Sequence, residues 1–554
     1  FRIFNAKPGG LAYSDNSGVN WTSVTGMGTT QFYGADKKAG VSAYVGGMQD
    51  NGTWFSGSDP SANSNWTRAF GGDGVEVAWN YADPNLMLLG YQNGNLYRST
   101  DGGYSFAAMP EAKAGTAAPF ISKIAHSKLD PDLVFTVGNA GVKRSDDFGK
   151  SWTLTPISGN WIGWRAFDNV EISVADPQVV WISSRMNYET WIGKQGGIHV
   201  SNDGGLTFTE ISQNFPANLV EASGIGTHPS QPETAYMLFS AANGPKVMRT
   251  TDLGQTWVDI SGFTPANSVS SNGFPNVAVY SLLVLPDNES TLWAGTEIGL
   301  FVSYDSGANW QLADNGLPNV GIFQMSVVDD EIIAATYGRG VWSAVDQLGA
   351  FTSPAVTLSP RLLNVGQSPQ GNLVIDVNLR SPYDSTQVIQ NGVSVLTIGA
   401  TETSLDTSLS KIIVQDETVQ VYALSYKDGR AYRSPEKTVE VSVSPAQYSY
   451  ISDLSSLSAM DDFSSVGFSI KPVSGFSNPA IHSVHPYENS KDYIIQLKTP
   501  IIVQAENAVL SYQDVALIEE GYGTSHLDPN FYDFVIIEGT RDGVNWIPLK
   551  TGYD

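Results

Sequence analysis

The chain has 554 residues and no cysteine, and its 30 lysine and arginine residues against 55 acidic ones leave a formal net charge of −25. Such a chain offers neither the basic face that nucleic acids require nor thiols for disulfides or metal sites. Its low share of charged residues, 15%, and its 55 glycines favour a turn-rich β protein, and no apolar run is long enough for a membrane-spanning helix.

One short repeat, Ser/Thr-x-Asp-x-Gly-x-x-Trp/Phe, organises the first 345 residues. Five copies match it in full, at 99–106, 145–152, 201–208, 250–257 and 303–310. A sixth, at 14–21, carries Asn16 in place of the aspartate, and a seventh unit keeps only Trp66. The closing aromatic residues recur every 40 to 56 positions, which leaves room for four short strands per unit. This period is typical of the blades of a β-propeller.

The unit that ends at Phe106 illustrates the expected blade. We predict an inner strand at 75–79, a second strand at 86–91, a third at 95–98 and a fourth from Phe106. The motif then forms the hairpin between the third and fourth strands. There its aspartate accepts backbone N–H bonds and its glycine allows positive φ. The five aspartates expected in this structural role are Asp101, Asp147, Asp203, Asp252 and Asp305.

The repeat resembles the Asp-box, or bacterial neuraminidase, repeat. That resemblance implies an all-β, multi-bladed propeller at 1–346, with about seven visible blades and with the repeat hairpins on the rim, away from the central channel. The first blade is predicted to be N-terminally incomplete, because Phe1-Arg2-Ile3-Phe4 reads as the second strand of a blade whose first strand lies upstream. A sialidase would begin Phe/Tyr-Arg-Ile-Pro, whereas the chain has Phe4 in place of the proline.

A more specific resemblance covers residues 29–34, 46–53, 71–74 and 337–342. These segments are similar to sortilin-like and xyloglucanase-like propellers of bacterial surface proteins that use the type IX secretion route. The resemblance implies a secreted protein, or one on the outer surface of a Gram-negative bacterium, that belongs to a larger assembly.

Two aspartates are candidates for glycoside hydrolysis. Asp73 lies in a Gly-Gly-Asp-Gly entry to an inner strand, and Asp50 follows a glycine-rich strand of the preceding unit. Carboxylates on adjacent blades can act as general acid and base on a glycosidic bond. Alternatively, both aspartates only bond backbone amides in their own turns.

Aromatic residues in the loops of the longest unit are candidates for binding a ligand. Trp161, Trp164, Tyr188 and Trp191 stand outside the repeat positions. Exposed rings of this kind stack on sugar faces, although packing in the core is an equal alternative.

The C-terminal third is predicted to form two β-sandwich domains. Residues 355–445 have the alternating strands of an immunoglobulin or fibronectin type III-like sandwich. Residues 447–554 resemble a jelly-roll module of bacterial secreted proteins, which implies a structural calcium ion held by Asp461, Asp462 and Asp533. No cofactor is otherwise required.

These features predict a secreted or cell-surface protein that binds a glycan or a protein through its propeller. The main alternative is an endo-acting, xyloglucanase-like glycoside hydrolase that uses paired carboxylates. A structural or adhesive module and a sialidase are further alternatives.

Overall fold

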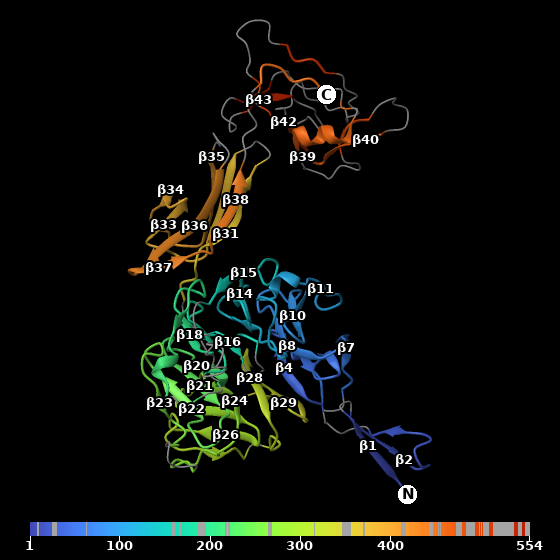
Figure 1. Cartoon of the computed structure of the whole chain (residues 1–554), viewed down its shortest axis with the longest axis vertical. Coiled ribbons are helices and arrows are strands. Elements are labelled where there is room, and N and C mark those ends of the chain that lie inside the picture. The colour runs from blue at the N-terminus through green and yellow to red at the C-terminus, as the bar shows by residue number, and fades with distance from the viewer. Residues whose placement is uncertain are drawn as a thin grey trace. The chain divides into compact units, whose positions relative to one another are not determined.

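The computed structural model describes most of the chain up to residue 441 and short stretches beyond it (Figure 1). The described residues are 1–7, 10–24, 30–61, 64–157, 161–164, 168–186, 196–216, 219, 222–263, 269–314, 316–345, 356–368, 372–411, 417–441, 447–452, 454, 456–472, 479–483, 493–497, 499, 501, 509–512, 537–540 and 546–548. The chain forms two compact units, 1–358 and 359–554.

The first unit is a β-propeller in which, among the described residues, seven antiparallel sheets follow one another around a central channel (Figure 1). From inner to outer strand, the first three sheets are β4 (Phe32–Lys37), β5 (Ala43–Met48), β6 (Gly52–Ser58) and β7 (Thr67–Phe70); β8 (Gly74–Trp79), β9 (Met87–Tyr91), β10 (Asn95–Ser99) and β11 (Ala107–Ala108); and β12 (Ala125–His126), β13 (Val134–Gly138), β14 (Gly141–Ser145) and β15 (Thr153–Pro156). The next three are β16 (Asn169–Ile172), β17 (Val180–Ser183), β18 (Ile198–Ser201) and β19 (Thr209–Glu210); β20 (Ala222–Thr227), β21 (Ala235–Phe239), β22 (Val247–Thr250) and β23 (Val258–Asp259); and β24 (Val279–Val284), β25 (Leu292–Thr296), β26 (Gly299–Ser303) and β27 (Gln311–Leu312). The seventh is β28 (Ile322–Val328), β29 (Glu331–Thr336) and β30 (Gly340–Val345), and two short 3₁₀ helices, η1 (Pro110–Ala112) and η3 (Ser212–Asn214), lie in the connections.

The hydrophobic core lies between neighbouring sheets, because both faces of most sheets are covered. Inner strands such as β8 are therefore buried along their whole length, and apolar residues of the next sheet pack against them. Close approach of the first two sheets requires glycine at Gly47, where a Cβ atom would lie 2.0 Å from the carbonyl oxygen of Val75. This approach sets the turn after β5 against the start of β8.

The ring closes between the last sheet and the first. Val328, Ile333 and Ala335 of β28 and β29 share a core cluster with Phe32 and Ala35 of β4. The N–H of Ala35 also donates to Oε1 of Gln324 at 2.8 Å. The closure joins segments almost 300 residues apart in the sequence.

A separate three-stranded sheet precedes the ring and consists of β1 (Ile3–Lys7), β2 (Gly10–Ser14) and β3 (Thr22–Ser23). Its strands pair with no other strand of the described residues, and they correspond to the second, third and fourth strands of a blade. Seven blades were expected and seven sheets form the ring, but their membership differs. The unit closed by Trp21 lies outside the ring, and β28–β30, which carries no repeat motif, is its seventh sheet.

The repeat hairpins form as predicted from their sequence. The N–H groups of Ser105, Ser151, Thr207, Thr256 and Asn309 donate to Oδ1 of Asp101, Asp147, Asp203, Asp252 and Asp305 at 2.8–2.9 Å. All five hairpins join the third and fourth strands of a sheet. In the sixth copy Asn16 takes the same role, with its Oδ1 accepting from the N–H of Asn20 at 2.8 Å. A side-chain oxygen is therefore what the turn requires.

The second unit contains a β-sandwich at residues 359–441. One sheet is formed by β31 (Arg361–Gln367), β32 (Leu373–Leu379) and β35 (Leu405–Lys411); the other by β33 (Ser385–Gln390), β34 (Val393–Ile398), β36 (Glu417–Lys427), β37 (Arg430–Arg433) and β38 (Lys437–Val441). Ile375, Val388 and Val421 belong to the core between them. The remaining elements are η4 (Leu457–Asp462), β39 (Phe463–Val466), β40 (Phe468–Lys471), β41 (Ala480–Ser483), β42 (Ile494–Leu497), β43 (Glu538–Thr540) and β44 (Trp546–Pro548). The jelly roll stays a prediction.

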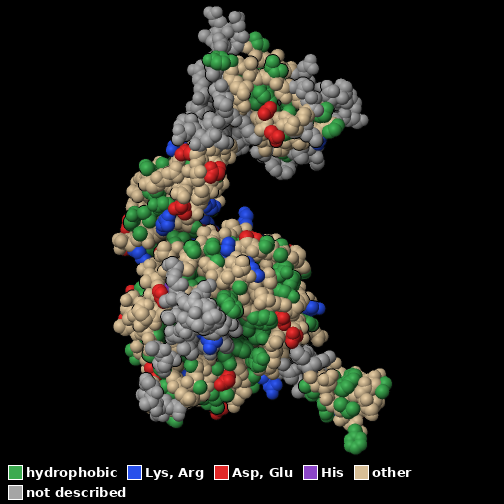
Figure 2. All heavy atoms as spheres, viewed as in Figure 1, with side chains coloured by type: hydrophobic (Ala, Val, Ile, Leu, Met, Phe, Trp, Pro, Cys, Tyr) green, Lys and Arg blue, Asp and Glu red, His purple; other side chains and the backbone are tan. Residues whose placement is uncertain are grey.

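Surface charge and helix content agree with the composition. Figure 2 shows lysine and arginine side chains scattered over this face of the described residues, without the continuous basic stripe that nucleic-acid binding needs. No helix in the described part of the chain has the length and apolar character of a membrane span.

Candidate functional site

Each blade has two chemically different ends. At one, which we call the hairpin end, the repeat hairpins cover the turns between first and second strands, as where the N–H of Gly102 donates to the carbonyl of Asn85 at 2.9 Å. Because neighbouring strands are antiparallel, the turns between second and third strands lie at the opposite end, beside the segments that enter the next inner strand. We call this opposite end the loop end.

Asp50 and Asp73 meet at the loop end of the first two blades. Asp50 occupies the turn between β5 and β6 with a left-handed φ of 59°, and Asp73 directly precedes β8. The backbone N–H of Asp50 donates to Oδ1 of Asp73 at 2.8 Å, and the N–H of Asp73 donates to Oε1 of Gln92 at 3.3 Å. Asp50 is exposed and Asp73 is half-buried. One carboxylate thus holds the turn that presents the other.

An aromatic cluster lies beside these carboxylates. Phe323 packs against Tyr33, Tyr280 and Tyr337, with ring centroids 5.8, 4.7 and 5.1 Å apart, and Tyr337 is 40% exposed. The Tyr33 hydroxyl donates to Oε1 of Gln49 at 2.7 Å. Burial, and then the nearby groups Tyr337, Asp73 and Asp50, raise the pKa of Tyr33 to about 12. Tyr33 therefore lies close enough to both carboxylates for their charges to act on its hydroxyl group.

β-Bulges aim three of these rings. Pairing of β4 with β5 passes from Phe32 to Gly34, so Tyr33 is the extra residue. The same shift leaves Tyr280 unpaired in β24 and Phe323 unpaired in β28. Bulges re-aim side chains, and here all three occur near the start of an inner strand, at the loop end of its blade. Sequence reasoning missed this cluster, because nothing in a single strand marks the extra residue.

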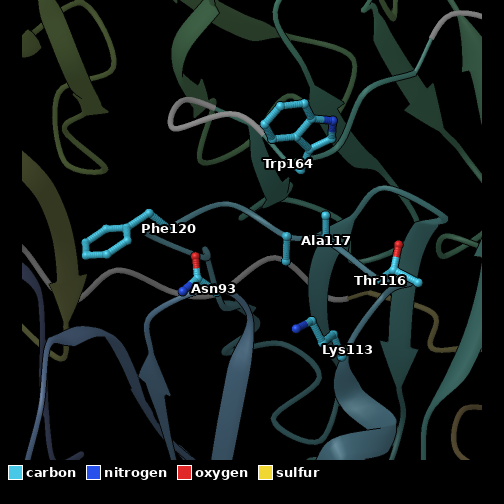
Figure 3. Close-up of a pocket in the computed structure, with 7 residues that line it drawn as sticks. Asn93, Lys113, Thr116, Ala117, Phe120 and Trp164 are labelled. Carbon is cyan, nitrogen blue, oxygen red and sulfur yellow. The ribbon is translucent and has the colours of Figure 1, made fainter.

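A surface hollow of about 430 Å³ adjoins this site, lined by Asn93, Lys113, Thr116, Ala117, Ala118, Phe120 and Trp164 (Figure 3). Asn93 follows Gln92, the acceptor for the N–H of Asp73. Trp164 is 39% exposed, as expected for a ring that contacts a ligand.

The other aromatic candidates differ from Trp164. Trp161 is only 6% exposed, donates through Nε1 to the carbonyl of Gly138 at 2.8 Å and belongs to the core. Of the two alternatives for Trp161, packing in the core is confirmed and an exposed ligand-binding ring is wrong, because the loop buries this indole against the third and fourth blades. Tyr188 and Trp191 lie outside the described residues.

Charged residues that sequence reasoning did not select line the channel. Glu76 of β8 forms an ion pair with Lys123 and accepts from Nε2 of Gln324 at 3.1 Å. Burial raises the pKa of Glu171 in β16 to about 7, with Lys123 opposing the shift. Glu76, Glu171 and Gln324 lie on three different blades, so only the closed ring brings these residues together.

A second charged group closes the hairpin end of the channel. Asp36 accepts from the N–H of Trp79 at 2.7 Å and lies 3.2 Å from Nε2 of His126, whose ring stacks on Tyr81. Burial lowers the pKa of Lys128 beside this group to about 8. The carboxylates of Asp36 and Glu76 thus have partners inside the protein, whereas Asp50 is exposed to solvent.

The predicted calcium ligands are only partly described. Asp462 accepts from the Tyr450 hydroxyl at 2.9 Å, Asp461 lies in the same 3₁₀ helix η4, and Asp533 is outside the described residues. No group of three or more metal-ligating side chains occurs among the described residues. The calcium site stays a prediction.

Comparison with known proteins points to xyloglucanases. No protein-family model matches the chain. A xyloglucanase from a Paenibacillus species is 26% identical over 338 residues, which make up 58% of this chain and 29% of that protein. A probable oligoxyloglucan-reducing end-specific xyloglucanase from Neosartorya fischeri is 22% identical over 227 residues, 39% of this chain and 26% of that protein.

Solved structures with a similar fold include two of the GH74 type. The GH74 xyloglucanase from Xanthomonas campestris has a TM-score of 0.43 and 17% identity, over 74% of this chain and 66% of that one. The GH74 enzyme from Niastella koreensis has a TM-score of 0.40 and 16% identity, over 86% of this chain and 74% of that one. The chain spans less than a third of the length of the two curated relatives. The fold is a β-propeller, and part of the sequence is similar to xyloglucanases.

Proposed function

We propose that the propeller acts on a polysaccharide as an endo-acting glycoside hydrolase, and that its loop end is the substrate face. The observation that carries the proposal is the meeting of Asp50 and Asp73 beside the Phe323 cluster. Carboxylates cleave glycosidic bonds in pairs, and aromatic rings hold sugar faces. Because the curated relatives are xyloglucanases, xyloglucan is the first substrate to test.

In this proposal the two aspartates have different tasks. Asp50 is exposed, so its carboxyl can reach a glycosidic oxygen and act as the acid. Asp73 is half-buried and receives an N–H bond from the same turn, which suits a fixed carboxylate that activates water or attacks the sugar. The exposed ring of Tyr337 would hold a neighbouring sugar while the bond is cut.

Binding without cleavage is the second candidate. It is favoured by the hydrogen bond that ties the Asp73 carboxylate to the Asp50 amide, since a carboxylate committed to a turn can be purely structural. The same face would then recognise a glycan as part of a secreted or surface assembly.

One experiment separates the two candidates. The chain is incubated with xyloglucan and with other β-glucans, while affinity and release of reducing ends are both measured. Hydrolysis predicts release that is lost in Asp73→Asn and Asp50→Asn with affinity retained. Binding with no release supports the second candidate, and no binding to any glycan contradicts both.

A further inference from the structure

The hollow at the loop end combines two aromatic rings with a lysine. Figure 3 shows Trp164 on one side of the segment that carries Ala117 and Phe120, and Asn93 and Lys113 on the other; all of them line the hollow. Asn93 comes from the β9–β10 turn of the second blade, and the other groups come from the connections before and after the third blade. They lie beside the proposed catalytic pair, because Asn93 is next to Gln92.

The walls of this hollow are held in place by hydrogen bonds. Oδ1 of Asn139 accepts from the N–H groups of Thr116 and Ala117 at 2.9 and 3.1 Å, and the N–H of Asn93 donates to the carbonyl of Phe120 at 3.2 Å. The segment that carries Trp164 packs closely on the next turn, since a Cβ atom at Gly163 would lie 2.0 Å from the carbonyl of Gly138. A preformed hollow binds without the cost of ordering loops.

Lys113 is the charge that gives the hollow its selectivity. It is half-buried, and no carboxylate of the described residues lies within ion-pair distance of it. The channel lysines differ, because Lys37 pairs with Asp329 and Lys123 pairs with Glu76. An ammonium group without a carboxylate partner among the described residues, in a chain of net charge −25, is available to an anionic ligand.

We propose that this hollow is a subsite for a sugar residue that carries a carboxylate, a uronate. The exposed face of Trp164 stacks on the sugar ring, the Lys113 ammonium pairs with the carboxylate, and Asn93 and Thr116 hydrogen-bond to hydroxyl groups. The inference rests on the proposed function and narrows it from glycans in general to glycans with acidic side groups or backbones. The chain's overall negative charge opposes such a ligand only weakly at physiological salt, where screening acts within about 8 Å.

The test compares a β-glucan oligosaccharide with the same oligosaccharide carrying glucuronate in place of one glucose. Isothermal titration with the full chain should show about tenfold tighter binding of the acidic oligosaccharide, as expected for hydrogen bonds to a charged group. The preference should shrink at 1 M salt. Lys113→Met should abolish the preference and leave affinity for the neutral oligosaccharide unchanged, whereas Lys113→Arg should keep it.

Matched variants separate the subsite from general effects. Lys150→Met removes an exposed lysine at the hairpin end and should change nothing. Trp164→Ala should weaken both oligosaccharides about threefold to tenfold, whereas Trp21→Ala, at a tryptophan 44% exposed on the separate sheet, should weaken neither. Equal binding of the two oligosaccharides, or a preference that survives Lys113→Met, overturns the inference alone. Failure of both to bind overturns the proposed function with it.

Discussion

The two ends of the propeller use their residues for different purposes. At the hairpin end, five copies of one motif make the same backbone bonds, and their carboxylates are occupied within four residues of chain. At the loop end the connections between second and third strands differ widely in length. β13 and β14 are joined by two residues, whereas fourteen residues, 184–197, separate β17 from β18. Repetition therefore stabilises the blades, and divergence supplies the site.

The distribution of bulges sharpens this contrast. Among the inner strands, register shifts occur in β4, β8, β20, β24 and β28, in each case near the start of the strand and thus at the loop end. The first blade has two further shifts, between β5 and β6 and between β6 and β7. A bulge interrupts the pairing locally and redirects one side chain. The propeller thus gives up regular pairing where it displays Tyr33, Tyr280 and Phe323.

The largest expected effect comes from exchanging an aspartate at each end. Asp73→Asn should lower the rate of glycan cleavage by about 10²–10⁴-fold, since it removes an acid–base or nucleophilic carboxylate. Asp203→Asn should leave the rate unchanged, because Asn16 already performs the hairpin role in the sixth copy. Equal loss of activity in both variants would contradict the assignment of catalysis to the loop end and of a structural role to the hairpin end. Reducing-end release at saturating substrate measures the difference.

Between the two ends of the propeller, a buried histidine should make the free energy of unfolding depend on pH. His199 in β18 is 1% exposed, and burial lowers its pKa to about 4. Because the unfolded side chain titrates near 6.5, stability is complete above that pH. It falls by about 3 kcal/mol as the pH drops from 6.5 to 4. Urea unfolding of His199→Gln should show a flatter pH dependence, whereas glycan affinity at pH 7 should not change; an unchanged slope contradicts the assignment.

Glu171 in the channel should give the stability the opposite pH dependence, with lower stability at high pH. Its folded pKa of about 7 exceeds the usual 4.5, so the folded state binds the proton more tightly. The free-energy cost of ionising Glu171 in the folded protein is absent below pH 4.5. It grows as the pH rises from 4.5 to 7 and is complete above pH 7. Glu171→Gln should therefore stabilise the protein at pH 8 by about 2 kcal/mol, after allowance for solvent contact in the channel, and have little effect at pH 4.5. Melting temperatures at both pH values test this.

The smallest expected effect is local to one hairpin. Asp203→Ala leaves the N–H of Thr207 and the Thr207 hydroxyl without their acceptor and should cost about 1–3 kcal/mol of stability. Glycan affinity of the folded variant should equal that of the unaltered protein. A loss of affinity as large as that in Trp164→Ala would mean that the hairpin end also contacts ligand.

The sequence by itself determined the blades and their hairpins. The strands predicted within 75–106 lie within one or two residues of β8 to β11, and the aspartate bonds form as expected. Both follow from interactions between residues close in the chain: the alternation of apolar side chains along a strand, and a side-chain oxygen that reaches an amide four positions later.

Only the tertiary structure decided what the loop end displays. Trp161 and Trp164 are three residues apart, yet one is core and the other is exposed, because burial depends on which blade the loop meets. The repeat alone did not show that the unit closed by Trp21 lies outside the ring, or that β28–β30, which carries no repeat motif, closes it. Phe323 reaches Tyr33 only through closure of the ring, and the Asp50 amide reaches Asp73 only because glycines let two sheets approach. These contacts join distant segments, and local pattern carries no information about them.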